Sequence, residues 1–294
     1  MNVSVIGAGQ MGNGIAQVFA TKGHQVTMVD LSQDVLDQAY QTISGSLDRL
    51  IRKERITEAG KQATLDRLQL QTELSVGVSN AELVVEAATE RLDLKLKIFE
   101  QLDAAAPASC ILATNTSSIS ITQIAAATQR PSQVIGMHFM NPVPIMKLVE
   151  VIRGYATSDE TTQQIMELSR ALSKTPVEVN DYPGFVANRI LMPMINEAIT
   201  TLWEGVAGVA EIDTVMKLGM AHPMGPLQLA DFIGLDTCLA ILNVLHDGFG
   251  RAHHAPCPLL VNMVRAGKMG RKSGEGFYDY SHGGKELVVA SGFT

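Results

Sequence analysis

The sequence predicts an α/β fold: a mostly parallel sheet with a projecting helical hairpin, followed by an all-α C-terminal domain. Up to about Asp181, short β-branched runs alternate with longer stretches of helical periodicity, as in a parallel sheet flanked by helices. Past the run DYPG at 181–184, the β-rich segments stop and helical patterns take over. Proline and glycine there mark a boundary. We therefore expect two domains, residues 1–182 and 183–294.

The strand candidates are short runs rich in valine, isoleucine and leucine. They span residues 3–6, 25–29, 83–86, 111–114, 134–136, 147–152 and 176–179. Residues 33–70 have helical periodicity and are unusually long and charged for a crossover, so we expect a helical hairpin that projects from the sheet. The apolar stretch 190–203 is shorter than the roughly 20 residues of a membrane-spanning helix, which favours a buried helix. The glycine-rich stretch 270–276 is typical of a surface connection.

The composition is that of a globular protein. A chain of 294 residues exceeds the comfortable size of one core, and 46% hydrophobic against 18% charged residues leave ample material for packing. The formal net charge of -7 argues against non-specific binding to nucleic acid or anionic membranes, although a local basic patch can still hold an anionic ligand. We expect no nucleic-acid partner and no membrane association.

Cysteine usage and the start of the chain bear on the compartment. Cys110, Cys238 and Cys257 are too few and too scattered for a disulfide framework or a spaced zinc site, and they suit a reducing environment. A strand-like run begins at Val3, which leaves no room for a secretory signal in front of it. Together these features predict a cytoplasmic protein.

A glycine-rich turn follows the first predicted strand and leads into a predicted helix. In a Rossmann-like unit the first glycine makes the tight turn, the second admits a pyrophosphate, and the third lets helix and strand pack closely. The helix N-terminus then offers N–H donors to the phosphates. The dinucleotide contacts predicted on this basis are Gly7, Gly9, Gln10, Met11 and Gly12. The alternative is an ordinary glycine turn.

The second predicted strand is followed by Asp30, at the distance where a carboxylate accepts hydrogen bonds from the adenosine ribose. Strand, helix and acid together favour a dinucleotide site over a surface turn. A carboxylate there repels the 2′-phosphate of NADP, and no arginine adjoins it. The sequence therefore predicts NAD as the cofactor.

Oxidation of a secondary alcohol needs a base for the hydroxyl proton, and histidine suits this role near neutral pH. Among seven histidines, His138 closes a predicted strand on the carboxyl side, where open α/β sheets keep their sites. Glu150 lies on a strand that can run beside it and would orient the imidazole. The alternatives are a structural histidine and a glutamate on an exposed strand face.

Polar residues at 115–118, with the sequence NTSS, follow another predicted strand at its carboxyl end. Their hydroxyl and amide donors could meet a reacting oxygen. Ser, Thr and Asn also cap helices constantly, so these residues could instead cap the helix that follows.

Several motifs, in order and spacing, resemble those of the short-chain L-3-hydroxyacyl-CoA dehydrogenases, including the bacterial 3-hydroxybutyryl-CoA dehydrogenases. They are GAGQMG at 7–12, NTSS at 115–118, HFMNP at 138–142, KLVEV at 147–151, PGFVANR at 183–189, Asp213 with MKLG at 216–219, PMGP at 223–226 and GEGFY at 274–278. The resemblance runs from the first strand almost to the C-terminus. It implies reversible NAD-dependent oxidation of an L-3-hydroxyacyl-CoA, above all 3-hydroxybutyryl-CoA, to the 3-ketoacyl-CoA.

The resemblance also implies roles for individual residues. His138 corresponds to the base that becomes an acid in the reverse direction, and Glu150 to its partner. Ser117 and Asn188 match residues that hydrogen-bond the substrate oxygen and hold the site together across the two domains. The further positions that match cofactor contacts are Asp30, Glu90, Lys95, Asn115, Ser117 and Asn141.

The projecting hairpin resembles the part of the family that meets coenzyme A, with Ser46, Lys53 and also Ser117 as substrate contacts. Independently, four basic residues cluster there on an otherwise acidic protein, a setting that phosphates favour. They are Arg49, Arg52, Lys53 and Arg55. The alternative is a solvated helix face partly balanced by Asp48 and Glu54. The hairpin is shorter than in some relatives.

Two other functions compete with this interpretation. One is a dehydrogenase of free β-hydroxyacids, which characteristically places a lysine rather than a His–Glu pair at the centre. The other is a catalytically idle NAD-binding protein, as in the lens crystallins that resemble the same family. His253, His254 and Cys257 do not suggest a metal site, because no fourth ligand accompanies them. The apolar C-terminal domain is the dimerising part in relatives, so we expect a homodimer.

Overall fold

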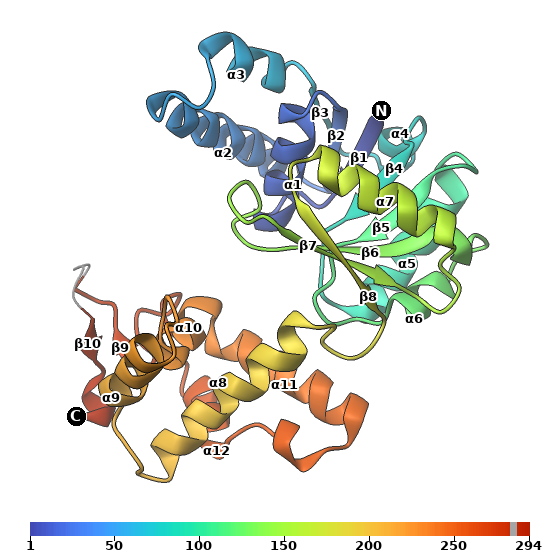
Figure 1. Cartoon of the computed structure of the whole chain (residues 1–294). Helices are drawn as coiled ribbons and strands as arrows, with labels where there is room; N and C mark the ends of the chain where they lie inside the picture. The colour runs from blue at the N-terminus through green and yellow to red at the C-terminus, as the bar shows by residue number, and fades with distance from the viewer. Residues whose placement is uncertain (283–286) are drawn as a thin grey trace. The chain divides into compact units, whose positions relative to one another are not determined.

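The computed structural model describes residues 1–282 and 287–294, and it divides into two compact units, Met1–Tyr182 and Pro183–Thr294 (Figure 1). The first unit is a sheet flanked by helices and the second is built mainly of helices. The predicted fold class is thereby confirmed. Each unit has its own apolar core.

Eight strands form the sheet of the first unit, in the order β3-β2-β1-β4-β5-β6-β7-β8. Their bounds are β1 Asn2–Ile6, β2 Gln25–Val29, β3 Leu68–Gln71, β4 Leu83–Glu86, β5 Ile111–Thr114, β6 Val134–Phe139, β7 Leu148–Arg153 and β8 Thr175–Asn180. Neighbours run parallel except β6 and β7, which are antiparallel. The chain therefore builds the sheet outward from β1, first to β3 on one side and then from β4 to β8 on the other. Strands β7 and β8 run in the opposite direction to the rest.

The helical hairpin is present, but the predicted helical span was too long. Helices α2 (Gln33–Arg52) and α3 (Glu58–Leu65) form the hairpin, whereas Leu68–Gln71 is strand β3, paired in parallel with β2. The four residues read LQLQ, an alternation of apolar and polar side chains that suits a strand. Such a short run merges with the helical pattern before it, which is why the strand was missed.

Helices cover both faces of the sheet. On one face α1 (Gln10–Thr21), α2 and α7 (Asp159–Ala171) share a continuous apolar core with the strands. On the other face lie α4 (Leu74–Val78), α5 (Leu92–Ala105) and α6 (Ile121–Ala125), and α6 places Ile121 against Gly136 of β6. Both layers leave the carboxyl ends of β1, β2, β4, β5 and β6 along one edge.

Within its described residues, the second unit contains the predicted apolar helix, α8 (Ala187–Trp203), and four further α-helices. They are α9 Val209–Thr214, α10 Pro226–Ile233, α11 Leu235–Phe249 and α12 Pro258–Arg265. A short antiparallel ribbon of β9 (Tyr278–Asp279) and β10 (Val288–Val289), which the all-α prediction lacks, closes the unit. Helix α8 is buried along only one side, since Ile190 remains 67% exposed.

Two buried aspartates organise the second unit. Asp213 accepts hydrogen bonds from the backbone N–H groups of Leu227 and Gln228 at 2.8 and 2.9 Å, which caps α10 from a distance. Asp231 accepts the N–H groups of Phe277 and Tyr278 at 3.0 and 2.9 Å.

The glycine-rich stretch before these residues packs on Asp231. A Cβ at Gly270 would lie 2.4 Å from the Asp231 carbonyl oxygen. Residues 271–273 are exposed, as predicted for a surface connection, but a Cβ at Gly276 would lie 1.9 Å from Oδ1 of Asp231, so glycine allows the chain to close tightly around this carboxylate.

Among the described residues, no single helix has the length and apolar character to cross a membrane. The bent pair Pro226–Ile233 and Leu235–Phe249, with an angle of 98° between them, passes the same test of length and composition only when taken together.

Candidate active site

The glycine turn after β1 has the shape that a dinucleotide needs. Gly7 has a φ of +93°, and a Cβ there would lie 2.5 Å from Cα of Ala88. A Cβ at Gly12 would overlap the Gly7 carbonyl oxygen, so α1 can approach β1 this closely only with glycine. No side chain caps α1 and its first turn has no acidic residue. The helix N-terminus is thus open to an anion.

Asp30 follows β2 and accepts a hydrogen bond from the Ala8 N–H at 2.8 Å. The same carboxylate lines a cavity of about 480 Å³ whose walls include Leu31, Leu74 and Lys97 of α5. A mostly apolar cavity lined by one carboxylate fits an adenosine. This geometry is compatible with NAD at the carboxyl edge of the sheet.

A buried cluster lies between β4, β5 and α5, and it joins the predicted Lys95 to Glu86, which sequence reasoning missed. The Lys95 ammonium is 2.5 Å from Glu86, the last residue of β4, and 3.3 Å from the Thr114 hydroxyl. Both Lys95 and Glu86 are at most 1% exposed. Glu86 also accepts the Ala88 N–H at 2.9 Å. An acid ending the otherwise apolar strand LVVE was the available signal.

Glu90 holds the polar loop after β5. One of its oxygens accepts the Ser117 N–H at 2.9 Å, the Ser117 hydroxyl at 3.2 Å and the Thr116 hydroxyl at 2.7 Å. Its other oxygen is 3.8 Å from the Lys95 ammonium. Glu90, Lys95 and Ser117, predicted separately, therefore lie together. Helix α6 is capped by Ser120 instead, so capping of α6 does not explain this loop.

The His–Glu pair is formed by the one antiparallel contact in the sheet. His138 of β6 stands directly opposite Glu150 of β7, and Nδ1 of the imidazole is 2.8 Å from Oε2 of the carboxylate. His138 is 9% and Glu150 2% exposed. Asn115, which follows β5, links the ends of β5 and β6, because its side chain accepts the Phe139 N–H at 2.9 Å. A histidine held this way has a defined orientation.

Two other predicted cofactor residues meet beside the glycine turn. The Gln10 amide donates to the Asn141 side chain at 3.4 Å, which links the first turn of α1 to the loop after β6. Met11 packs partly buried against the core. The remaining predicted catalytic residue, Asn188, belongs to the second unit, where it is buried in the first turn of α8.

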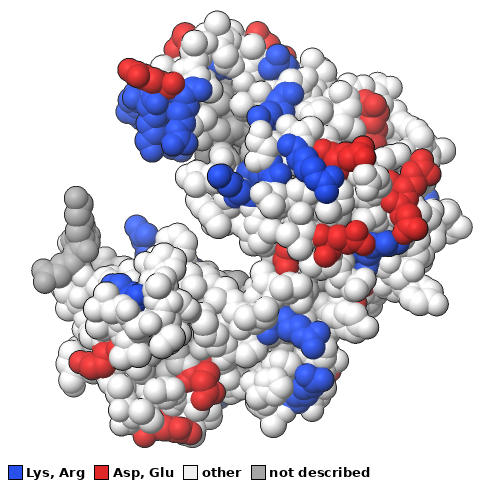
Figure 2. Space-filling model, in the orientation of Figure 1, with Lys and Arg blue, Asp and Glu red and all other residues white. Residues whose placement is uncertain are grey.

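The hairpin carries the predicted substrate contacts. Ser46 is half-buried within α2, and Lys53 is exposed directly after that helix ends. Figure 2 shows lysine and arginine side chains gathered at this end of the hairpin. Asp48 pairs with Lys61 of α3 at 2.5 Å. In the part of the chain that the structure describes, no ion pair neutralises the four clustered cations.

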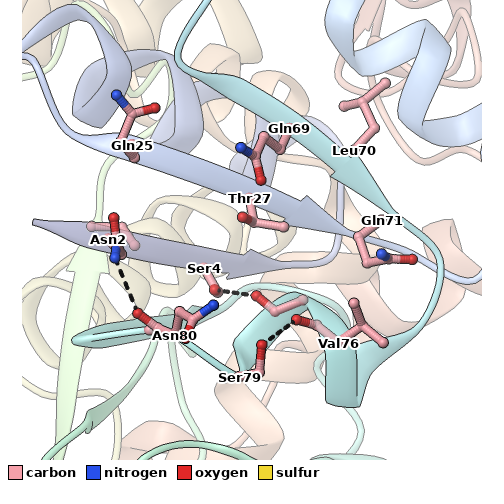
Figure 3. Close-up of a pocket in the computed structure, with 13 residues that line it drawn as sticks. Asn2, Ser4, Gln25, Thr27, Gln69, Leu70, Gln71, Val76, Ser79 and Asn80 are labelled. Carbon is pink, nitrogen blue, oxygen red and sulfur yellow. Dashed lines mark hydrogen bonds between the residues drawn. The ribbon is translucent and has the colours of Figure 1, made fainter.

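A second cavity, of about 330 Å³, lies on the face of β1, β2 and β3. Its walls carry neutral polar side chains, among them Ser4, Thr27 and Gln69 (Figure 3). Ser4 donates to the Gly77 carbonyl at 2.6 Å. Asn2 and Gln25 begin their strands, so this cavity extends towards the amino ends, away from the histidine.

No cluster of three or more His, Cys, Asp or Glu side chains within residues 1–282 and 287–294 could hold a metal ion. His253 and His254 stack on each other, with ring centroids 4.1 Å apart.

Comparisons with known proteins show the family to which the chain is similar. The family model described as 3-hydroxyacyl-CoA dehydrogenase, NAD binding domain matches residues 2–182, and that of the C-terminal domain matches residues 184–280. A probable 3-hydroxybutyryl-CoA dehydrogenase of Deinococcus radiodurans is 56% identical over 280 residues, which is 95% of this chain and 100% of the relative. The corresponding Bacillus subtilis protein is 53% identical, covering 95% and 96%. The crystal structure of (S)-3-hydroxybutyryl-CoA dehydrogenase from Ralstonia eutropha has a TM-score of 0.92 at 51% identity, covering 95% and 98%.

Proposed function

Because this chain belongs to the 3-hydroxyacyl-CoA dehydrogenase family and is an NAD-dependent enzyme of that kind, we propose that its substrate is L-3-hydroxybutyryl-CoA, with His138 as the catalytic base. The four-carbon substrate is supported by the names of the bacterial relatives at 53–56% identity. The observation that carries the mechanism is the 2.8 Å contact between His138 and Glu150.

The residues at the carboxyl edge fit a bound NAD. The open N-terminus of α1 would hold the pyrophosphate, and Asp30 would accept the adenosine ribose hydroxyls. Glu90, Lys95, Asn115 and Asn141 surround the region between the turn and His138, where the nicotinamide half would lie. When bound, NAD supplies the acceptor for the hydride that leaves C3 of the hydroxyacyl group.

His138 would take the proton of the substrate hydroxyl as the C3–H bond breaks, so that the alcohol becomes a ketone. Glu150 engages Nδ1, which assigns the proton transfer to Nε2. The carboxylate also stabilises the imidazolium that results. In the reverse direction the same imidazolium returns the proton to the ketone oxygen as an alcohol forms.

Ser117 would hold the reacting oxygen. The Ser117 backbone N–H already bonds to Glu90, so the Ser117 hydroxyl proton can turn to a substrate oxygen without leaving Glu90 unsatisfied. This contact strengthens as the oxygen gains negative charge. Asn188 is proposed as a further catalytic residue on its match to the family motif alone.

Ser46 and the unneutralised cations around Lys53 would bind the phosphates of coenzyme A. Charged and bidentate donors suit phosphate groups, and Arg49, Arg52 and Arg55 supply them beside Lys53.

A homodimer through the second unit is part of the same proposal. Large apolar side chains remain exposed there, with Leu218 at 81%, Met220 at 61% and Trp203 at 56%. Apolar groups of this size on one unit favour association. Light scattering at micromolar concentration should give the mass of two chains, and the mass of one chain would contradict the proposal.

A chain-length series tests the function. With NADH as the reductant, the kcat/KM of the purified enzyme should be highest for acetoacetyl-CoA. It should fall as the 3-ketoacyl chain lengthens. Free acetoacetate should be a poor substrate. A maximum at longer chains would reject the four-carbon assignment, and equal rates with the free acid would contradict the coenzyme A site.

A further inference from the structure

We propose that Lys174 is a positioning residue for the cofactor-binding loop 141–146, which it holds by two hydrogen bonds from its charged ammonium group. This inference rests on the proposed function, in which Asn141 contacts the dinucleotide. Lys174 lies between α7 and β8 and is 9% exposed. Its ammonium donates to the carbonyl oxygens of Val143 at 2.5 Å and Met146 at 2.7 Å.

The surroundings of this ammonium are unusual for a lysine. Its partners are neutral carbonyl groups, and among the residues that the structure describes no carboxylate pairs with it. Burial lowers the pKa of Lys174, and the nearby Lys22 lowers it further. A buried cation without a counter-ion is costly, so its two carbonyl partners must be held firmly in place to compensate.

The ammonium does not serve the helix that precedes it. Lys174 follows α7, whose final carbonyls would attract a cation, yet both hydrogen bonds go to the loop after β6. Only its backbone N–H returns to α7, at the Ser169 carbonyl. The side chain therefore acts on the loop.

The loop also packs against α1, the helix after the glycine turn. Val143 is 2% exposed, and a Cβ added at Gly14 of α1 would lie 2.9 Å from its Cβ. Within the loop, the N–H groups of Ile145 and Met146 both reach the Pro142 carbonyl. Asn141, at the start of the loop, accepts from Gln10 beside the glycine turn.

Lys174 and Gly14 thus both contact the same turn. Loss of the ammonium would release the carbonyls of Val143 and Met146 and let Asn141 move away from Gln10. Binding of the dinucleotide should suffer more than the proton transfer at His138, because His138 is held by β6, β7 and Glu150. The expected signature is a change in NADH affinity with little change in kcat.

The test measures the Kd of NADH by fluorescence, without acyl substrate, on the full-length protein. Lys174→Met should weaken NADH binding about tenfold, the loss expected when an interaction with a charged donor disappears. At saturating NADH, kcat with acetoacetyl-CoA should stay within about threefold of wild type. Since the Kd needs no turnover, this result is independent of whether the acyl substrate has been assigned correctly.

Lys22→Met is the matched control, because the Lys22 ammonium donates to Ser173 at 2.7 Å but does not reach the loop. Its NADH affinity should stay within about twofold of wild type, and Lys174→Arg should recover part of the lost affinity. The Ile145 and Met146 amides should exchange with deuterium faster in Lys174→Met alone.

An NADH Kd that is unchanged in folded Lys174→Met, or weakened equally in Lys22→Met, would overturn the proposal. If Lys174→Met does not fold, Lys174→Gln keeps an uncharged amide NH2 donor group and should show an intermediate Kd. An unchanged Kd in that variant would overturn it equally.

Discussion

Both units bury carboxylates, but with different partners. At the sheet edge, Glu150 meets the imidazole of His138 and Glu86 meets the ammonium of Lys95. In the second unit, Asp213 and Asp231 accept hydrogen bonds from backbone N–H groups. A carboxylate paired with an ionisable side chain can take part in catalysis or cofactor binding. A carboxylate that accepts backbone N–H groups instead stabilises the fold.

The tyrosines strengthen the contrast. The Tyr278 hydroxyl donates to Asp213 at 2.8 Å, and the Tyr280 hydroxyl lies 3.2 Å from Asp231. Burial raises the pKa of Tyr278 far above its usual range, and the bond to Asp213 adds to this effect. These phenols remain neutral donors near neutral pH. Two acids thus connect three elements of the second unit.

The largest expected effect lies at the sheet edge. His138→Gln should lower kcat about 10³-fold, since it removes the base, while the free energy of unfolding changes little. NADH oxidation with acetoacetyl-CoA and urea denaturation measure the two quantities. Turnover that survives this substitution would end the assignment of His138.

Glu150→Gln should reduce kcat about 10²-fold, because the imidazole loses the carboxylate that orients it and stabilises its charged form. The KM for NADH should change little. A defect confined to KM would instead show that Glu150 acts on binding.

The buried aspartates of the second unit should affect stability alone. Asp231→Ala leaves two buried N–H groups without acceptors and should cost about 3 kcal/mol of unfolding free energy. The kcat of the remaining folded enzyme should stay near that of wild type. A large fall in kcat at unchanged stability would erase the distinction between the two regions.

A smaller effect belongs to the hairpin. Lys53→Glu should raise the KM for acetoacetyl-CoA about tenfold and leave the KM for NADH nearly unchanged, because the reversed charge repels the phosphates of coenzyme A. Lys61→Glu is not a suitable control, since Lys61 pairs with Asp48. Lys97→Glu, in the adenosine cavity, should show the opposite pattern. Equal changes in both constants for Lys53→Glu would reject the coenzyme A site.

The smallest effect is a pH dependence of stability. Burial raises the pKa of Asp231 from its ordinary value of 3.8 to about 6. Between these values the folded protein holds a proton that the unfolded chain has lost, so this group's contribution to stability falls as pH rises from about 4 to 6. The unfolding free energy of wild type relative to Asp231→Asn should fall over that range. A difference that rises with pH would contradict the sign.

The sequence allowed much of the first unit to be predicted. The alternation of runs identified seven of its eight strands, and the comparisons confirmed the family and the NAD-dependent activity. His138 could be singled out because a strand end leads to the sheet edge. Local patterns were sufficient wherever a function depends on where a strand stops.

Contacts between side chains of different elements could not be predicted in the same way. The pairing of Glu86 with Lys95 depends on how α5 packs against β4, and the closure of Gly270 on Asp231 joins segments 39 residues apart. Neither leaves a periodic trace. Strand β3 was missed for a different reason, since four alternating residues are too few to stand out from the helix before them.

The reversal of direction at β7 has a consequence for engineering. Since side chains alternate between the two faces of a strand, deleting one residue of β7 ahead of Glu150 would present a valine to the histidine and turn the acid to the opposite face. Deleting two residues would return the acid to the same face of the sheet as His138, but the acid would no longer lie directly opposite the histidine. Loss of activity in a one-residue deletion that still folds would verify this dependence on strand register.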